Sequence, residues 1–186
     1  MIKNIKIVAV LTFTCLLCAF LLSLVNILAR DETEKNQRRE IEEAIFNLSP
    51  LTKRIEKFIL DNDNVYRLLD QDNKLVGYGF IAQGNGYQGT IKILVVANQS
   101  LDELEGIEII ESSETPGLGG RIKEGLFKDQ FKKLKVQPQI ECIKDGTKKA
   151  NQIQSITSAT ISSKAVVNIV NQKIKEIRDN INNESK

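Results

Sequence analysis

Two short stretches of small and polar residues carry the side chains best suited to bind a ligand. The first is Glu114-Thr115-Pro116-Gly117-Leu118-Gly119-Gly120, whose three glycines let the backbone approach a ligand closely or take positive φ angles. The second is Thr157-Ser158-Ala159-Thr160, which places three hydroxyls directly ahead of a predicted helix. Such a helix N-terminus favours an anion such as phosphate. An ordinary surface turn and an ordinary N-cap cluster have the same local composition, so both alternatives stay open.

The composition narrows the chemistry of these stretches. The 186 residues include no His, which removes every His-based catalytic group and every His metal ligand. A Ser nucleophile would then need a Lys or acidic base, and nothing in the sequence brings Lys164, the nearest downstream Lys, to Ser158 or Thr160. Cys15 and Cys18 lie in an apolar run without a second pair, which favours a plain membrane helix over a metal or redox site. We therefore expect no catalytic side chain and no metal.

The charge distribution argues against a nucleic-acid partner. The chain has 26 basic and 24 acidic residues, and Lys3 and Lys6 are the only charges before Arg30. The remainder is therefore neutral overall, whereas a nucleic-acid-binding domain normally has a basic excess.

The N-terminal region predicts a membrane helix. The run from Ile7 to Ala29 contains no charged residue and, at about 1.5 Å per residue, is long enough for a hydrocarbon core of about 30 Å. A cleaved signal peptide is the alternative, but its apolar core is usually shorter, and Ile27-Leu28-Ala29 is a poor cleavage site because its first residue is bulky. An uncleaved single helix is favoured. Basic residues flank both ends, so charge alone does not orient it.

The rest of the chain alternates helical and strand patterns. Residues 30–48 continue as an amphipathic helix, Ser49-Pro50 ends it, and the spacing of Leu51, Ile55, Phe58 and Ile59 predicts a second short helix. Strands are predicted over residues 65–69, 74–82, 90–97, 106–111 and 136–143, with Gln71-Asp72-Asn73 joining the first two as a hairpin. Further helices are predicted over 121–134, with Ile122, Leu126, Phe127, Phe131 and Leu134 on one face, and from about Ile161 to Asn182.

This order predicts an α+β fold, an antiparallel sheet flanked by helices and preceded by one N-terminal transmembrane helix. We expect a tail and membrane helix at 1–29, a helical stalk or linker at 30–64, and a folded domain at 65–186.

Three motifs in this order resemble the FMN-binding domain family. They are Gly86-Tyr87-Gln88-Gly89-Thr90-Ile91, the segment Glu114–Gly119 followed by Phe127 and Gln130-Phe131, and Thr157–Thr160 followed by Ser162 and Ser163. The family includes the G subunit of the Rnf ion-translocating electron-transport complex and the C subunit of the sodium-translocating NADH:quinone reductase. The similarity covers about residues 70–180, and the length fits the Rnf G subunit.

The resemblance implies a cofactor and its attachment. In that family a flavin transferase joins FMN from FAD, through its phosphate, to the last Thr of the motif, which is Thr160 here. Glu114, Thr115, Pro116, Gly117, Leu118 and Gly119, with Thr157, Ser158 and Ala159, would line the flavin site. The family pattern has Asp where this chain has Gln154, and most often Gly where it has Ser158. We expect Gly117 and Gly119 to shape the flavin pocket, and Gly119→Val to disturb the flavin while leaving the fold largely intact.

The resemblance also implies a function and a location. The protein would relay electrons as a subunit of an inner-membrane complex that couples ferredoxin–NAD electron transfer to translocation of Na⁺ or H⁺. Its FMN domain would lie on the extracytoplasmic, periplasmic side, and its partners would be the other subunits and the flavin transferase. The alternatives are a stand-alone FMN-binding electron carrier for another extracytoplasmic reductase and a membrane-tethered sensor or binding domain without a cofactor.

Overall fold

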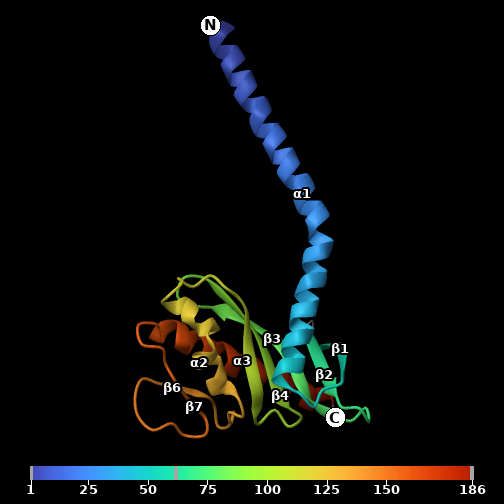
Figure 1. Cartoon of the computed structure of the whole chain (residues 1–186), viewed down its shortest axis with the longest axis vertical. Helices are drawn as coiled ribbons and strands as arrows, with labels where there is room; N and C mark the ends of the chain where they lie inside the picture. The colour runs from blue at the N-terminus through green and yellow to red at the C-terminus, as the bar shows by residue number, and fades with distance from the viewer. Residues whose placement is uncertain (1, 61–62, 185–186) are drawn as a thin grey trace. The chain divides into compact units, whose positions relative to one another are not determined.

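Runs of β-branched residues form the central strands of an antiparallel sheet (Figure 1). The computed structural model describes residues 2–60 and 63–184. The sheet has the order β1-β2-β3-β4-β5, and each neighbouring pair is antiparallel. The strands are β1 (Arg54–Leu60), β2 (Asp63–Leu69), β3 (Leu75–Asn85), β4 (Thr90–Asn98) and β5 (Leu104–Ser112). The expected α+β class is confirmed.

Both faces of the sheet are covered. Ile93 and Val95 of β4 belong to the hydrophobic core that also contains the apolar stripe of the last helix. Leu94 and Val96, on the opposite face, pack in a smaller core with Ile45, near the end of helix α1 (Ile2–Leu48). Because both faces are buried, β4 is a continuous apolar run rather than an alternating one.

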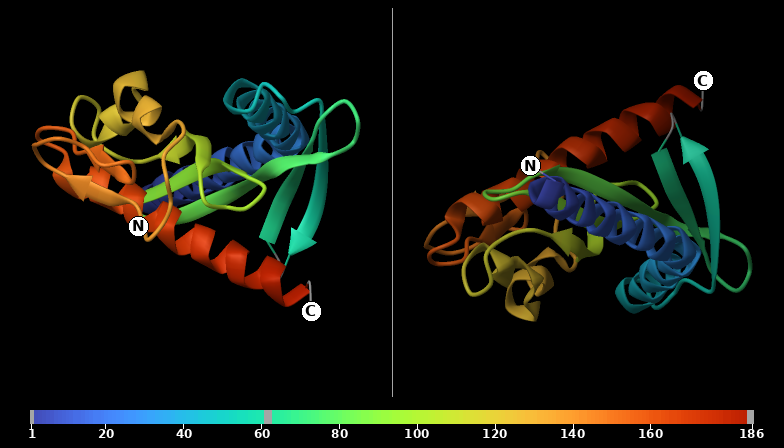
Figure 2. Two further views of the ribbon diagram at one scale, coloured as in Figure 1. Left: turned by 90° about the horizontal axis from the view of Figure 1, so that it is seen from below. Right: turned by 90° about the horizontal axis from the view of Figure 1, so that it is seen from above.

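The last helix, α3 (Thr160–Glu184), has the amphipathic pattern expected from the sequence. Its buried stripe is Val166, Val167, Ile169, Val170, Ile174 and Ile177. The helix contacts β3 and β4, and Figure 2 shows that it crosses these strands at an angle. Lys173 on α3 pairs with Asp63 at the start of β2, which ties the helix to the sheet. The helix therefore fixes where its N-terminal residue, Thr160, lies.

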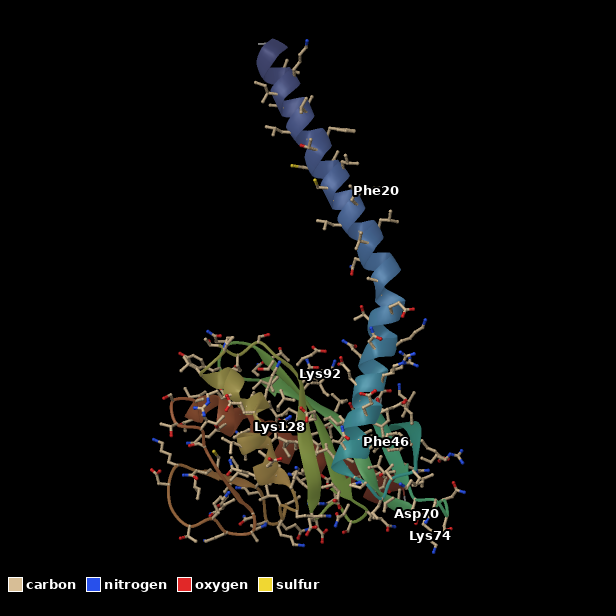
Figure 3. All side chains as sticks on the ribbon, viewed as in Figure 1. Phe20, Phe46, Asp70, Lys74, Lys92 and Lys128 are labelled. Atoms are coloured by element: carbon tan, nitrogen blue, oxygen red, sulfur yellow. The ribbon has the colours of Figure 1, made fainter. Side chains whose placement is uncertain are left out.

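The predicted hairpin between β2 and β3 is confirmed. One Asp70 carboxylate oxygen, Oδ1, accepts hydrogen bonds from the backbone N–H groups of Asp72 at 2.8 Å and Lys74 at 2.9 Å. Asn73 takes a left-handed φ of 58°, which Asn tolerates in turns. Asp70 and Lys74 are labelled at this turn in Figure 3.

The second short helix expected over Leu51–Ile59 is wrong. This segment contains strand β1, which pairs with β2 in the register Phe58 to Val65. The spacing of its apolar residues fits both a helix and a strand, and pairing with β2 decides for the strand. The Arg67 guanidinium lies 4.5 Å from the centre of the Phe58 ring, which adds a cation–π contact to the pair.

Two further elements differ from expectation. Residues 121–134 form three short turns of helix, η1 (Gly119–Lys123), α2 (Gly125–Lys128) and η2 (Asp129–Phe131), instead of one helix. The break at Glu124, whose backbone is extended, changes the phase, so Leu126 is 82% exposed while Phe127 is buried. The predicted strand at 136–143 is reduced to β6 (Glu141–Ile143), parallel to β7 (Gln152–Gln154). Pro138 has no N–H for a ladder, and the backbone of Ile140 bonds to the Asn171 side chain instead.

The N-terminal helix contains one stretch, Ile5–Asn26, that is long and apolar enough to cross a membrane, with a mean hydropathy of 2.6. Phe20, labelled in Figure 3, is 64% exposed, and this stretch buries nothing within the protein itself. The chain separates into two units, Met1–Glu40 and Ile41–Lys186. Residues 1, 61–62 and 185–186, which the expected ranges 1–29, 30–64 and 65–186 include, lie outside the described residues.

Candidate functional site

Three segments that are distant in sequence meet at one end of the sheet. They are the turn at Gly86–Gly89 between β3 and β4, the loop after β5, and the first turn of α3. Between them lies a cavity of about 480 Å³. Its lining residues are Tyr87, Glu114, Thr115, Leu118, Gly119, Ser158, Ala159, Thr160, Ile161 and Ser162. This volume is within the range of small-molecule sites, about 300–1,000 Å³.

Most of the residues predicted for a ligand site line this cavity. Glu114, Thr115, Leu118 and Gly119 do so from the loop, and Ser158, Ala159 and Thr160 do so from the start of α3. Pro116 and Gly117 are exposed at the tip of the loop and do not line it. Thr157 lines a separate cavity of about 250 Å³ together with Gln154. The structure thus brings the two predicted stretches together at one cavity, and Thr157 faces the smaller cavity instead.

Glu114 joins the three segments. Its Oε1 atom accepts hydrogen bonds from the N–H groups of Tyr87 at 2.7 Å and Gln88 at 2.9 Å. Its Oε2 atom accepts one from the Ser162 hydroxyl at 2.5 Å. The side chain is buried, which alone would raise its pKa. The hydrogen bonds from Ser162 and from the backbone of Gln88, Tyr87 and Gly89 outweigh burial, so the pKa of Glu114 lies below its usual value.

The loop after β5 is closed by its own backbone. The Thr115 carbonyl accepts hydrogen bonds from the N–H groups of Leu118 at 3.2 Å and Gly120 at 2.9 Å. Gly117 takes a φ of +76°, a conformation that favours glycine. A Cβ atom at Gly119 would overlap Glu114 Oε2 and lie 2.5 Å from Ser162 Oγ. The expectation that Gly119→Val leaves the fold largely intact is therefore wrong, because the larger side chain would displace a buried carboxylate.

A turn held by Ser163 presents Thr160. The Ala159 N–H donates to the Ile156 carbonyl at 3.0 Å, and Ser158 inside this turn has a φ of +72°. The buried Ser163 hydroxyl accepts from the Ile156 N–H at 3.0 Å and donates to the Ala159 carbonyl at 2.9 Å. Thr160 is the first residue of α3, and its hydroxyl forms no hydrogen bond within the described residues. Helix N–H groups in this first turn lack intrahelical partners.

Neither Lys164 nor Gln154 takes part in the cavity. Lys164 is exposed and forms no ion pair or hydrogen bond with Ser158 or Thr160 among the described residues, so no Ser–Lys pair is assembled.

The Gln154 side chain donates to the Lys144 carbonyl at 3.2 Å. The Gln130 amide bonds both the N–H and the carbonyl of Gln154, at 2.8 and 3.1 Å. Gln154 thus has a local structural role that an Asp side chain, which has no N–H donor, would not reproduce.

Sequence reasoning left three lining residues, Tyr87, Ile161 and Ser162, without a role at the site. Ser162 appears in the family motif, but its bond to Glu114 joins residues 48 positions apart. Tyr87, 67% exposed, stands at the rim of the cavity because Glu114 holds its N–H. A glycine-flanked aromatic residue before a strand is the only local signal for it.

Comparisons with known proteins identify the family of this chain. Residues 86–175 match the FMN-binding domain family. A 151-residue alignment is 30% identical to the G subunit of the ion-translocating oxidoreductase complex of Methanosarcina acetivorans and covers 79% of this chain and 76% of the relative. The chain belongs to the family of these G subunits.

Other relatives agree with this membership. The chain is 37% identical over 105 residues to the G subunit of the Na⁺-translocating ferredoxin:NAD⁺ oxidoreductase complex of Acetobacterium woodii. It is 34% identical over 105 residues to the G subunit of the proton-translocating ferredoxin:NAD⁺ oxidoreductase complex of Clostridium ljungdahlii. These matches cover 55% and 56% of this chain, and the chain spans about half the length of each of the two relatives, 50% and 55%.

Solved structures show the same fold. The C subunit of the Na⁺-translocating NADH-quinone reductase from Parabacteroides distasonis aligns with a TM-score of 0.53 and 21% identity, covering 62% of both chains. NqrC of Shewanella oneidensis aligns with a TM-score of 0.57 and 16% identity, covering 69% of this chain and 68% of that one. At these identities the likeness concerns the fold alone.

The cavity has the features that FMN requires. Leu118 and Ile161 are 49% and 59% exposed, so with Tyr87 they offer apolar and aromatic surface to a planar ring. The N-terminus of the 25-residue helix α3 suits a phosphate group. The residues present therefore fit the cofactor of the family.

Proposed function

We propose that this protein carries FMN covalently attached to Thr160. We also propose that it relays electrons as the G-type subunit of a membrane complex that couples ferredoxin–NAD electron transfer to ion translocation. The observation that carries the proposal is the position of Thr160. It is the first residue of α3, it opens on the 480 Å³ cavity, and it lies in the segment that matches the FMN-binding domain family.

Several features support Thr160 as the attachment residue. Its hydroxyl is not engaged by another of the described residues, and the adjacent helix N-terminus stabilises the charge that remains on a phosphodiester. Ser158 lines the same cavity and is the competing hydroxyl, whereas Thr157 faces the smaller cavity. A flavin transferase would transfer the FMN unit of FAD to the Thr160 oxygen, with AMP as the leaving group. The covalent link would prevent loss of the flavin from an extracytoplasmic site.

The residues around the cavity would hold the flavin without acting as acid or base. Bound FMN supplies the redox chemistry. Leu118, Ile161 and Tyr87 would cover the ring and exclude water, and the backbone of Glu114–Gly119 would run beside it. Among the described residues that line the cavity, none other than Glu114 is ionisable near neutral pH, and Glu114 is occupied by its hydrogen bonds.

The N-terminal helix and the family support a proposal for the location of the protein. Ile5–Asn26 would anchor the protein once in the inner membrane, with the FMN domain on the periplasmic side. The partners would be the other subunits of an Rnf-like complex. Because β1 belongs to the sheet, we place the start of the FMN-binding unit before Arg54, within the unit Ile41–Lys186, rather than at residue 65.

The test is co-expression of the full chain with a flavin transferase. We expect a UV-fluorescent band on a denaturing gel and an added FMN phosphoryl group on the Thr160 peptide by mass spectrometry. Thr160→Ala should abolish both, Thr160→Ser should retain part of the label, and the control Ser158→Ala should retain it. Flavin found on Ser158 or Thr157 would refute the assignment to Thr160. An unmodified wild type that gains flavin only as Gln154→Asp would show that this chain has lost native attachment.

A further inference from the structure

The carboxylate of Glu114, which belongs to the loop, forms hydrogen bonds with the other two segments that line the cavity. Its two oxygens accept hydrogen bonds from the Gly86–Gly89 turn and from Ser162 on α3. Within the described residues, the bond to Ser162 is the only hydrogen bond that links the first turn of α3 to either of the other segments. An exposed bond from the Thr115 hydroxyl to Gln88 Oε1, at 2.6 Å, links the loop and the turn.

Two glycines make room for this carboxylate. A Cβ atom at Gly86 would overlap Glu114 Oε1, and one at Gly119 would overlap Glu114 Oε2. Neither glycine has a positive φ, so backbone conformation does not demand glycine at either position. The space at Gly86 is taken by Glu114 and by Ile91, whose Cδ1 atom would lie 2.7 Å from the added Cβ, and the space at Gly119 is taken by Glu114 and Ser162. The turn and the loop therefore both leave room for the Glu114 carboxylate.

The hydrogen bonds also favour the ionised form of Glu114. Two backbone N–H groups, those of Tyr87 and Gln88, donate to Oε1, and the Ser162 hydroxyl bonds Oε2. Hydrogen bonds to a carboxylate stabilise its charge, and they hold the pKa of Glu114 below its usual value despite burial. Glu114 is 6% exposed, so its negative charge is poorly screened by water. The cavity thus contains one fixed negative charge in its wall.

We propose that Glu114 is a positioning residue of the flavin site: it holds Tyr87 and the start of α3 in place, and its charge lowers the reduction potential of the flavin. The inference rests on the proposed function, since it presumes that FMN occupies this cavity. A nearby negative charge opposes the addition of electrons to the flavin, and low dielectric strengthens that effect. Glu114 then acts through the residues it holds and through its field.

The experiment compares flavinylated full-length variants. Glu114→Gln keeps the shape and can still accept the two N–H bonds, but it removes the charge. We expect unchanged FMN on Thr160 by mass, an upward shift in flavin reduction potential and a shifted visible spectrum. Glu111→Gln, on the exposed face of β5 where Glu111 pairs with Lys92 at 3.1 Å, is the matched control and should leave the potential unchanged.

Ser162→Ala separates position from charge. It removes one hydrogen bond to Glu114 and leaves the carboxylate in place, so it should alter the visible spectrum with a smaller shift in potential than Glu114→Gln. If Glu114→Gln fails to fold or to acquire flavin, Ser162→Ala still tests the positioning role, because an unchanged visible spectrum would contradict it. A wild-type potential and spectrum in both variants would overturn the inference, as would a larger potential shift in Ser162→Ala. A wild type that never acquires flavin would instead refute the proposed function.

Discussion

The tight packing of Gly119 against Glu114 predicts that Gly119→Ala destabilises the folded unit. The added methyl group would lie 2.5 Å from Ser162 Oγ and 3.1 Å from Glu114 Cβ, and it would overlap Glu114 Oε2. Real Cβ atoms are essentially never found within 3.0 Å of another heavy atom, so either the carboxylate or the loop must move. Since Oε2 is bonded to Ser162, movement of the carboxylate disrupts that bond.

The magnitude follows from these contacts. A buried hydrogen bond to a charged group contributes about 1.5–3 kcal/mol, and overpacking of a filled site costs about 1–3 kcal/mol. Because the two effects share the same displacement, we expect a combined loss of about 2–4 kcal/mol in the free energy of unfolding. For a domain of this size that lowers the melting temperature by about 5–15 °C.

The assay is thermal unfolding of the full chain in detergent, followed by far-UV circular dichroism. Gly125→Ala is the matched control, because its new methyl group would lie 3.5 Å from Asp129 Oδ2, an ordinary contact, within α2. Ala is favoured over Gly in a helix by up to about 1 kcal/mol, so this variant should be as stable as the wild type or slightly more stable. A Gly119→Ala protein with the same melting temperature as the Gly125→Ala protein would refute the reasoning.

Three further predictions concern the same chain. Ser158→Gly should raise the free energy of unfolding by up to about 1 kcal/mol. The left-handed φ of +72° costs a residue with a Cβ about 1–2 kcal/mol, and glycine avoids this strain but loses more backbone entropy on folding, which offsets part of the gain. A lower melting temperature of the variant would contradict this prediction. The lowered pKa of Glu114 means that its contribution to stability is present above the ordinary value of 4.5 and is lost as the pH falls through the folded-state pKa, so acid unfolding should be less steep in Glu114→Gln than in Glu111→Gln. The full chain should stay in membranes after a carbonate wash because of Ile5–Asn26, and a mature protein beginning after Ala29 would exclude the anchor.

Local patterns were enough for much of the fold. The apolar stripe of α3 and the Ile- and Val-rich run of β4 each identify their element, since a spacing of 3.6 or a buried run depends only on neighbouring residues. The turn at Asp70–Asn73 is equally local, because the Asp70 side chain bonds backbone groups two and four residues ahead. The small residues of Glu114–Gly119 and Thr157–Thr160 indicated where a ligand site would form, and the cavity lies between them.

Long-range contacts decided what those patterns left open. Leu51–Ile59 has apolar spacing compatible with a helix, and only its partner strand β2 makes residues 54–60 a strand. Leu126 fits a helical face by spacing, but the extended backbone at Glu124 turns it outward. The sequence places Glu114 at the start of a glycine-rich loop. Its role depends on Ser162, 48 residues later, and on donors near Tyr87, 27 residues earlier. The periodicity of apolar residues indicates only which side of its own helix or strand a residue faces. The hydrogen bonds of Glu114 need three segments that are distant in sequence, and only tertiary packing brings these segments together.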